Sequence, residues 1–461
     1  MNTGDFPSIG EWSDFDGLKG MWEKRLPEVL RRAGRSDFYR GRLGDDLPGG
    51  LADLEGLPLT TKDDLRASYP FGMVAVPRRE LVSYHESSGT SEGAPTASFH
   101  TEADWAEMLD RFGRNRVGLA DTDTVLVRVP YAMVTIAHQV HAAARAAGSL
   151  VVPADARSTA MPLPRVLRLM RDLRVTVAAA LPTEPLLWAA CARLAGESPR
   201  SHAPDLRALL SAGEPLSPAR RRRIEELWGC EVHLSYGNSE CGANLGGECP
   251  ERNLHLWADR YLPEVLDPET GLVSFEGRGR LVLTTLHREA MPLVRYDTGD
   301  YAEVTYGGCP CGWPLPRVRV VGRWDHGVSL RGRRDRVFAS EVENAVFSLP
   351  SELGVLFWRA VEDEGVLRVR VEAVDAAAGE VSTALVREVE EAVGVRPEVE
   401  VVPVGTLVPL EELTRRSFTA KPRYLAPAGA TGAGGPMYAG TAPPTGAEGA
   451  ERAPGPDTVR P

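Results

Sequence analysis

Four short segments carry residue types that could bind a nucleotide, and the first is rich in glycine and hydroxyl groups. It runs Ser87-Ser88-Gly89-Thr90-Ser91-Glu92-Gly93-Ala94-Pro95-Thr96. Such a loop presents many N–H and O–H donors and can wrap a polyphosphate. It lacks the lysine and the spacing of a Walker motif, so a P-loop NTPase is excluded. A plain surface loop is the alternative.

The other three segments carry a tyrosine, carboxylates and an arginine. Ser235–Glu240 follows an alternating apolar pattern that predicts a strand end, where Tyr236 could stack on a purine and Glu240 could hold a divalent cation. In Pro292–Asp300, a carboxylate after a glycine turn can accept two hydrogen bonds from a ribose diol. Gly322–Asp325 brings charged residues to a joint between two domains. A capped strand-to-helix turn, a β-turn and a solvated linker are the respective alternatives.

The cysteines suggest a metal site. Cys309 and Cys311 form a tight knuckle, and Cys249 and His255 lie upstream in a polar loop. Three thiols and one imidazole suit a tetrahedral structural zinc site, with unmetallated thiols as the alternative. Six cysteines in 461 residues do not make a disulfide framework, so a reduced, cytoplasmic setting is expected.

The overall composition excludes several classes of protein. The formal net charge of −11 argues against a surface for nucleic acid. No run of 18 uncharged apolar residues is present, so no membrane-spanning helix is expected. The first twelve residues lack a basic run and an apolar segment, so no signal peptide is expected.

The chemical segments must be positioned by strands and helices that alternate from Val82 to about Thr298, a pattern that predicts a parallel sheet. Expected strands are Thr124–Val129, Leu150–Val152 and Thr176–Ala180, and expected helices are Leu163–Leu173 and Pro218–Leu227. Pro58–Leu65 is typical of a turn with a capping threonine followed by a helix. Gly271–Val304 is rich in strands and glycine turns, which predicts a β subdomain.

A second, smaller domain follows residue 322. Strands at Leu367–Val374 and Glu398–Val404 flank a helix at Val381–Val393, which predicts a compact α+β unit over residues 323–425. The fold class is therefore α/β, with a large N-terminal domain over residues 1–322. Residues 426–461 are mostly alanine, glycine, proline and threonine, a composition that predicts a disordered tail.

Taken together and in this order, the segments resemble the adenylate-forming ligases, and within them the phenylacetate–CoA ligase group. The resemblance covers about residues 55–425. It rests on Leu57–Leu65, Tyr69–Gly72, Ser87–Thr96, Ser211–Pro215, Tyr236–Glu240, His255–Glu264, Leu283–Leu286, Arg295–Asp300 and Gly322–Arg323.

The resemblance implies an enzyme that works in two steps. A small-molecule carboxylate attacks the α-phosphate of Mg·ATP and gives an acyl-adenylate and pyrophosphate. The C-terminal domain, residues 323–425, then swings about the joint near Asp325, and a thiol, with CoA expected, takes the acyl group. The resemblance assigns residues 1–322 to the AMP-binding domain. Both reactants of the first step are anionic, so catalysis rests mainly on positioning and charge compensation.

The resemblance also assigns roles to individual residues. The phosphate loop would use Ser87, Ser88, Gly89, Thr90, Ser91 and Gly93. The rest of the nucleotide would contact Gly213, Glu214, Pro215, Tyr236, Gly237, Asn238, Ser239 and Asp300. Glu240 would orient Mg²⁺, Arg323 would assist Asp300, and Lys421 would bridge the carboxylate and the α-phosphate. Tyr131, Ala132, His138 and Ala212 would line the acyl pocket. Some members of this group carry a zinc site, which agrees with the cysteine cluster.

Two departures from the family pattern leave alternatives open. Ala94 stands where many relatives have lysine, so one phosphate contact is absent or is supplied elsewhere. Residues 331–340, with four arginines, form a longer segment near the face used in the thiol step. The adenylate could therefore pass to a carrier-protein thiol, an amine or a small inorganic nucleophile. A zinc-knuckle binding protein with an inactive ligase fold is a further alternative, and a homodimer is compatible with the sequence.

Overall fold

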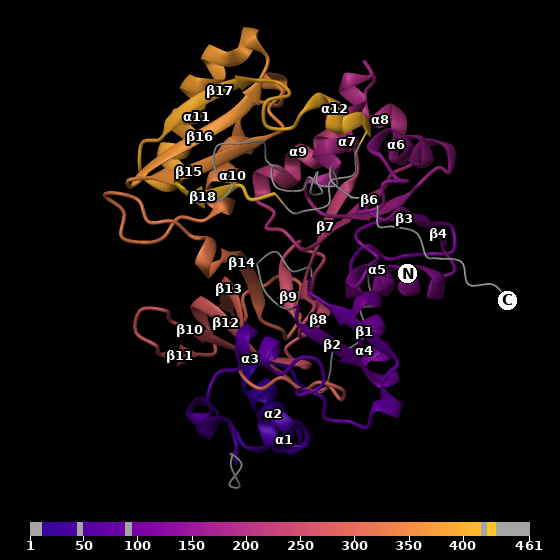
Figure 1. Ribbon diagram of the computed structural model, residues 1–461, viewed down its shortest axis with the longest axis vertical. Helices are drawn as coiled ribbons and strands as arrows, with labels where there is room; N and C mark the ends of the chain where they lie inside the picture. Colours follow the sequence, from indigo (N-terminus) through magenta and orange to yellow (C-terminus); the bar gives the residue numbers. More distant parts are fainter. Residues whose placement is uncertain (1–11, 44–48, 88–94, 416–421, 430–461) are drawn as a thin grey trace, which may run out of the picture.

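The computed structural model describes residues 12–43, 49–87, 95–415 and 422–429. Its helices are α1 (Phe15–Ala33), α2 (Asp37–Arg40), α3 (Lys62–Ala67), α4 (Glu102–Gly113), α5 (Thr135–Ala146), α6 (Leu163–Asp172), α7 (Glu184–Leu194), α8 (Pro199–His202), α9 (Pro218–Trp228), α10 (Ala339–Ser348), α11 (Ala378–Val393) and α12 (Leu410–Arg415). The expected fold class, α/β with a large unit and a smaller C-terminal sheet unit, is confirmed (Figure 1).

Within the described residues, a large mixed sheet runs in the order β11-β10-β12-β13-β14-β9-β8-β7-β6-β5-β3-β4. Its parallel part is β3 (Thr124–Arg128), β4 (Leu150–Pro153), β5 (Val177–Ala180), β6 (Ala208–Ser211) and β7 (Glu231–Asn238). Its antiparallel part is β8 (Gly242–Glu248), β9 (Leu254–Leu256), β10 (Tyr261–Leu266), β11 (Val273–Ser274), β12 (Gly277–Thr285), β13 (Tyr296–Thr305) and β14 (Arg317–Arg323). The parallel sheet and the β subdomain expected from the sequence are both present.

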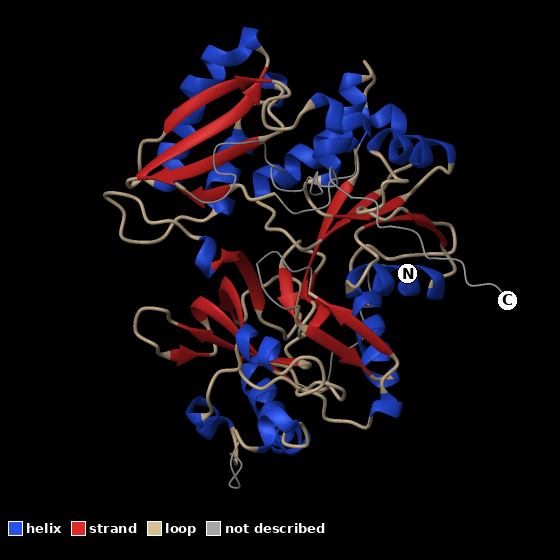
Figure 2. Ribbon diagram, viewed as in Figure 1, coloured by secondary structure: helices blue, strands red, loops and turns tan. Residues whose placement is uncertain are grey.

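The parallel strands have helical crossovers, as their short, almost wholly apolar runs require. Helices α6, α7 and α9 cover one face of this part of the sheet, and α4 and α5 cover the other (Figure 2). In a parallel sheet the carboxyl ends of the strands meet at one edge, and the loops there commonly hold ligands. The loop after β3 contains Tyr131 and Ala132, the loop after β6 contains Ala212–Pro215, and β7 itself ends with Tyr236, Gly237 and Asn238.

A separate small hairpin and a helix cap introduce the phosphate loop. Strands β1 (Ser83–Glu86) and β2 (Ala97–His100) pair antiparallel and flank that loop. Before them, Thr61 caps α3 by accepting from the backbone N–H of Asp64, while Asp64 accepts from the N–H of Thr61. The turn and capped helix predicted over Pro58–Leu65 are therefore confirmed.

The C-terminal unit is a second sheet in the order β17-β16-β15-β18, with α10 and α11 packed on it. Its strands are β15 (Trp358–Asp363), β16 (Val366–Ala373), β17 (Glu398–Pro403) and β18 (Leu425–Pro427). Strand β18 pairs parallel with β15 and includes Ala426 and Pro427, which the sequence analysis assigns to the tail. The rest of that tail, residues 430–461, lies outside the described residues.

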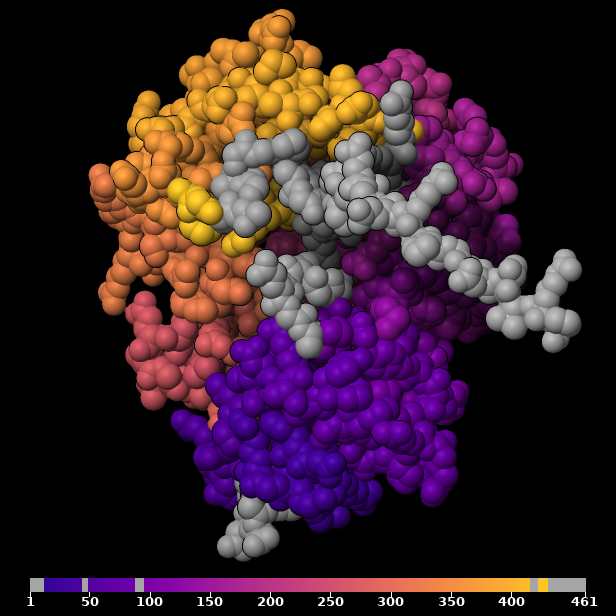
Figure 3. All heavy atoms as spheres, viewed as in Figure 1, coloured from indigo at the N-terminus to yellow at the C-terminus, as the bar shows by residue number. Residues whose placement is uncertain are grey.

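One continuous hydrophobic core joins the two units. It contains Leu187 and Ile224 from α7 and α9 together with Val346 and Phe347 from α10 of the C-terminal unit. In the space-filling view the orange C-terminal residues pack beside the magenta residues of the large unit (Figure 3). The structure therefore fixes one relative orientation of the two units.

No helix of the described residues has the length and apolar character needed to cross a membrane.

Candidate active site

The predicted ribose contact lies where three strands of the large sheet meet. Asp300 on β13 is the register partner of Arg323 on β14. The Tyr236 hydroxyl, from β7, donates to Asp300 Oδ2 at 2.6 Å, and Arg323 NH1 lies 3.3 Å from Oδ1. Arg323 NH1 also donates to the carbonyl of Thr298 at 2.6 Å. Three residues from distant parts of the sequence are therefore brought together.

Burial raises the pKa values of both Asp300 and Tyr236. Burial raises the pKa of Asp300, although the neighbouring Arg323 and the Tyr236 hydroxyl act against the rise. Burial, and then the charge of Asp300, raise the pKa of Tyr236 well above its ordinary value, so the phenol stays a neutral donor. A carboxylate accepts about four hydrogen bonds, so Asp300 keeps acceptor positions for a diol.

The strand that carries Tyr236 is held close to its neighbour. A Cβ at Gly237 would lie 2.2 Å from the carbonyl oxygen of Ala243, far inside van der Waals contact. Glycine at this position therefore lets β7 and β8 approach each other. Next along the chain, Asn238 Oδ1 accepts from the N–H of Cys241 at 2.7 Å and closes the turn that presents Ser239 and Glu240.

Glu240, the predicted magnesium residue, is buried beside groups from two other segments. The Thr96 hydroxyl donates to Glu240 Oε1 at 3.0 Å and lies 2.7 Å from the Ser87 hydroxyl. Lys62 Nζ lies 3.4 Å from the same carboxylate oxygen. The structure thus places the first residue of the phosphate loop next to the predicted cation ligand. Residues 88–94, with Ser88, Gly89, Thr90, Ser91 and Gly93, lie outside the described residues.

Lys62 is a residue of this site that the sequence analysis missed. It is the first residue of α3 and directly follows the capping Thr61. The cap was visible in the sequence, but no spacing pattern could show that the lysine reaches Glu240, 178 positions later in the chain. Its charge lies at the carboxylate that would face the triphosphate.

The predicted nucleotide-binding residues Gly213, Glu214 and Pro215, with Ala212 of the predicted acyl pocket, lie in the loop that follows β6. Gly213 has a φ of +83°, a left-handed conformation that glycine adopts without strain. The Glu214 side chain is buried, and its Oε2 accepts from the Thr183 hydroxyl at 2.6 Å. This carboxylate therefore points into the protein and fixes the loop from beneath.

Two of the four predicted acyl-pocket residues, Tyr131 and His138, border one hollow that lies along α5. The hollow at α5 has about 570 Å³ and is lined by Tyr131, His138, His141, Ala142, Arg145 and Ala146. His138 Nε2 donates to the Tyr131 carbonyl at 2.9 Å, and the Tyr131 hydroxyl lies 3.2 Å from His141 Nδ1. Ala132 and Ala212 are not among its lining residues.

His85 is a second residue that the sequence analysis missed. Its ring is buried on β1, with its centroid 5.5 Å from that of His138. Within the described part of the chain, neither ring nitrogen has a hydrogen-bond partner. Burial, followed by the charges of His138 and Arg288, lowers the pKa of His85 to about 4, so the ring is neutral at pH 7.

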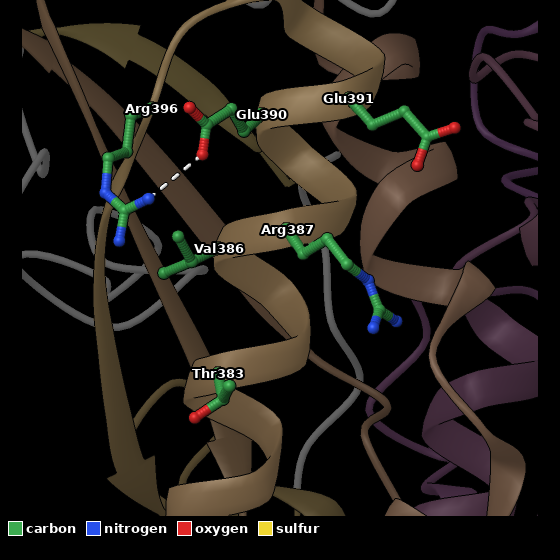
Figure 4. Close-up of a pocket in the computed structure, with 6 residues that line it drawn as sticks. All are labelled: Thr383, Val386, Arg387, Glu390, Glu391 and Arg396. Carbon is green, nitrogen blue, oxygen red and sulfur yellow. Dashed lines mark hydrogen bonds and ion pairs between the residues drawn. The ribbon is translucent and has the colours of Figure 1, made fainter.

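A different hollow, of about 440 Å³, lies on α11 of the C-terminal unit (Figure 4). It is lined by Thr383, Val386, Arg387, Glu390, Glu391 and Arg396. Arg396 pairs with Glu390 at 3.1 Å, and none of the predicted site residues lines it. We assign it no part in the chemistry.

The four predicted zinc ligands form one cluster. The ligand atoms of Cys249, His255, Cys309 and Cys311 all lie within 4.8 Å of one another. Sγ of Cys249 is 3.8 Å from Sγ of Cys309, and Sγ of Cys311 is 3.5 Å from Nε2 of His255. His255 Nδ1 donates to the Leu315 carbonyl at 2.9 Å, which leaves Nε2 as the lone-pair nitrogen facing the thiols. The donor set fits a tetrahedral metal ion.

The arginines of the segment over residues 331–340 mostly bond within the C-terminal unit. Arg331 donates to the Glu364 carbonyl at 3.0 Å, and Arg333 donates to Glu341 Oε1 at 2.7 Å. Arg336 donates to the Gly327 carbonyl at 2.6 Å. These side chains hold the segment against its own unit. Lys421, the predicted catalytic lysine, lies outside the described residues.

Comparison with known proteins gives a consistent result. The profile of the family described as AMP-binding enzyme matches residues 73–283. A phenylacetate-coenzyme A ligase of Thermus thermophilus is 36% identical over 346 residues, which cover 72% of this chain and 76% of that protein. One from Aromatoleum evansii is 33% identical over 389 residues, covering 80% of this chain and 85% of that protein.

Solved structures agree on the fold. A 2-hydroxyisobutyryl-CoA ligase in the postadenylation state superposes with a TM-score of 0.76 at 23% identity, covering 92% of this chain and 94% of that one. The same ligase in the thioesterification state, with CoA, gives 0.64 at 25% identity, covering 93% and 94%.

Proposed function

Because the chain belongs to the phenylacetate–coenzyme A ligase family of AMP-binding enzymes, we propose that it activates an aromatic or arylalkanoic acid as its acyl-adenylate and transfers the acyl group to CoA. It is an ATP-dependent acid–thiol ligase, and the resemblance drawn from the sequence is confirmed at that level. Its substrates are a small-molecule acid, ATP and CoA.

The first step is a displacement at phosphorus. A carboxylate oxygen of the acid bonds to the α-phosphorus of ATP while the bond from that phosphorus to pyrophosphate breaks. In the second step the CoA sulfur bonds to the acyl carbon, and AMP leaves with the electron pair of the acyl–oxygen bond. Negative charge accumulates at the phosphate in the first step, so correctly placed cationic groups stabilise the transition state.

The convergence of Tyr236, Asp300 and Arg323 is the observation that carries this proposal. We assign the two ribose hydroxyls to Asp300, the purine to the face of Tyr236, and the adenine edge to the loop over Gly213–Pro215. Gly237 and Asn238, at the end of β7, and Ser239, in the turn that follows, separate the purine site from Glu240. The hydrogen bonds of 2.6 and 3.3 Å to Asp300 support its role, because they fix the carboxylate before a nucleotide binds.

The phosphates are assigned to the loop over residues 87–93. Glu240 would hold Mg²⁺, which supplies positive charge against the triphosphate. Lys62 lies 3.4 Å from Glu240 and would supply the positive charge that the phosphate loop lacks, since its sequence has Ala94 in place of a lysine. By its sequence context, Lys421 bridges the carboxylate and the α-phosphate.

We assign the acyl group to the space between Tyr131, Ala132, His138 and Ala212. The hollow along α5 supports the part of this assignment that concerns Tyr131 and His138. We also propose a structural zinc ion held by Cys249, His255, Cys309 and Cys311. Such an ion would crosslink β9 to the loop before β14.

We place the boundary between the AMP-binding domain and the mobile C-terminal domain at residues 322 and 323, where β14 ends. The alternative acceptors, a carrier-protein thiol, an amine or an inorganic nucleophile, keep the same first step. Arg331, Arg333 and Arg336 already make hydrogen bonds within the C-terminal unit. We therefore expect other cationic groups to bind the phosphates of CoA.

The test is an assay with a panel of acids. The purified chain is mixed with ATP, Mg²⁺ and phenylacetate, benzoate or an aliphatic acid of similar size, with and without CoA. We expect acid-dependent release of pyrophosphate with the aromatic acids and a CoA thioester by mass spectrometry. Pyrophosphate without thioester would favour another acceptor, and no pyrophosphate with any acid would refute the proposal.

A further inference from the structure

A tyrosine of the C-terminal unit reaches into the large unit. Tyr424 directly precedes β18, its carbonyl accepts from the N–H of Ala360 at 2.7 Å, and its ring stacks on Trp358 with centroids 5.1 Å apart. These contacts make it part of the small sheet. Its hydroxyl, however, lies 2.7 Å from the Thr183 hydroxyl and 3.1 Å from Arg220 NH2, both in the large unit.

Arg220 is the centre of a buried polar cluster that both units supply. It lies on α9, is wholly buried, and donates through NH2 to the Thr183 hydroxyl at 2.8 Å. Through NH1 it donates to Glu343 Oε2, on α10 of the C-terminal unit, at 2.9 Å. The other oxygen of Glu343 accepts from the backbone N–H of Ser217 at 2.8 Å.

The same cluster reaches the predicted nucleotide loop over Gly213–Pro215. Thr183 donates to Glu214 Oε2 at 2.6 Å, and Arg220 NH2 lies 3.6 Å from that oxygen. One threonine hydroxyl therefore contacts both the carboxylate of the nucleotide loop and the phenol of the C-terminal unit. We call Thr183, Glu214, Arg220, Glu343 and Tyr424 the interdomain cluster.

The cluster belongs to one arrangement of the two units. It exists in the present arrangement, which superposes on a 2-hydroxyisobutyryl-CoA ligase with a TM-score of 0.76 in the postadenylation state and 0.64 in the thioesterification state. Any rotation that carries the C-terminal unit away must separate Tyr424 and Glu343 from Thr183 and Arg220. Buried polar groups left without partners are costly, so the cluster favours the arrangement in which all of them are paired.

We propose that Tyr424 is a positioning residue for the adenylation step: its hydroxyl, bound to Thr183 and Arg220, holds the C-terminal unit against the loop of Glu214. This inference rests on the proposed function, because it divides the two steps of that reaction between two arrangements. Tyr424 does not touch the reacting atoms. Its contribution is to the orientation of the C-terminal unit, which also carries Lys421 three positions earlier in the sequence.

The experiment measures the two half-reactions separately in Tyr424→Phe, which keeps the ring on Trp358 and removes only the hydroxyl. Adenylation is followed as acid-dependent release of pyrophosphate in a single turnover. Thioester formation is followed after mixing the enzyme with synthetic acyl-adenylate and CoA. We expect adenylation to slow by about tenfold, the effect of losing one hydrogen bond to a charged partner, and thioester formation to remain at the wild-type rate or rise.

Two further variants make the result specific. Thr183→Val removes the same hydrogen bond from the large unit, together with the bonds to Glu214 and Arg220, so it should slow adenylation at least as much. Adding Tyr424→Phe to Thr183→Val should then cause little further loss. Tyr306→Phe is the matched control, because the buried Tyr306 hydroxyl has no partner among the described residues and lies outside the cluster. It should leave both half-reactions unchanged.

The outcomes separate this inference from the proposed function. Equal losses in both half-reactions would mean that Tyr424 only supports the fold, and no loss in either would mean that its hydroxyl is dispensable. Both results overturn the inference while wild-type activity stands. Absence of pyrophosphate release by the wild-type chain, with every acid tested, would instead overturn the proposed function.

Discussion

Replacing Asp300 by asparagine should weaken ATP utilisation strongly while leaving the fold intact. Its two oxygens each have one protein neighbour, Tyr236 at 2.6 Å and Arg323 at 3.3 Å, which leaves one acceptor position on each for a ribose hydroxyl. Asparagine keeps one acceptor oxygen and turns the other into a donor. Arg323 retains its 2.6 Å hydrogen bond to the Thr298 carbonyl, so it does not become an unpaired buried charge.

The size of the effect follows from these contacts. A hydrogen bond to a charged group contributes about 1.5–3 kcal/mol. Loss of one such bond and weakening of the second gives roughly 2–4 kcal/mol, which is about 30- to 900-fold in kcat/KM for ATP. The Tyr236 hydroxyl, whose pKa burial and Asp300 raise, remains a donor and should still bond to the amide oxygen.

The assay is steady-state pyrophosphate release at varied ATP and saturating acid. Glu303→Gln is the matched control, since Glu303 lies on the same strand and makes an exposed ion pair with Arg319. Exposed pairs contribute about 0–1 kcal/mol, so the control should stay close to wild type. An Asp300→Asn enzyme with wild-type kcat/KM for ATP, or one no worse than the control, would refute the assignment of the ribose to Asp300.

Three further predictions concern the lysine, the metal and pH. Lys421→Ala should slow adenylation by about 2.7–4 kcal/mol, or roughly a hundredfold to a thousandfold, because a cation at the developing phosphate charge is lost; wild-type pyrophosphate release would contradict it. Protein purified without chelator should hold about one zinc per chain, and Cys309→Ser with Cys311→Ser should abolish it in elemental analysis; metal retained in full by the double variant would show that the ligands lie elsewhere. Burial, then the charge of Arg116, lowers the pKa of His233 to about 3, so between pH 6.5 and 3 the unfolded chain binds a proton that the folded chain excludes. The free energy of unfolding should therefore fall with falling pH, and His233→Gln should reduce that slope by about 1.4 kcal/mol per pH unit in urea titrations between pH 6 and 4; an unchanged slope would contradict the burial argument.

The strands and helices that surround the site could be predicted because their patterns are local. The short apolar run Thr124–Val129 predicted β3, and the amphipathic stretch Leu163–Leu173 predicted α6. Both predictions lie within a residue or two of the observed bounds. The β18 strand at Leu425–Pro427 was not predicted. Three residues carry too little periodicity, and their strand character comes from pairing with β15, more than sixty positions earlier.

Residue identities at the site were predictable where an ordered series of motifs carried them, but their partners were not. The sequence offered Tyr236, Asp300 and Arg323 as separate candidates, and the hydrogen bonds between them come from the antiparallel sheet. Lys62 and His85 were missed because a helix start and a short strand supply no chemical signal. They matter only because folding brings each to a distant side chain.

The interdomain contacts lie further beyond the reach of sequence reasoning. Arg220 is the first of four consecutive arginines on α9, a run typical of a solvated surface, and yet it is wholly buried between carboxylates of both units. The basic segment over residues 331–340 shows the converse. Its four arginines form a basic run near the face expected for the thiol step, and three of them bond to neighbouring groups of the C-terminal unit.

The attack of the carboxylate on the α-phosphorus is the central claim, and an isotope transfer tests it most directly. The acid substrate is labelled with ¹⁸O in its carboxylate, and the products of complete turnover with ATP and CoA are analysed by mass spectrometry. The account predicts one ¹⁸O atom in AMP and none in pyrophosphate, because the bridging oxygen of the acyl-adenylate leaves with AMP. Unlabelled AMP, or label in inorganic phosphate formed together with ADP, would contradict it.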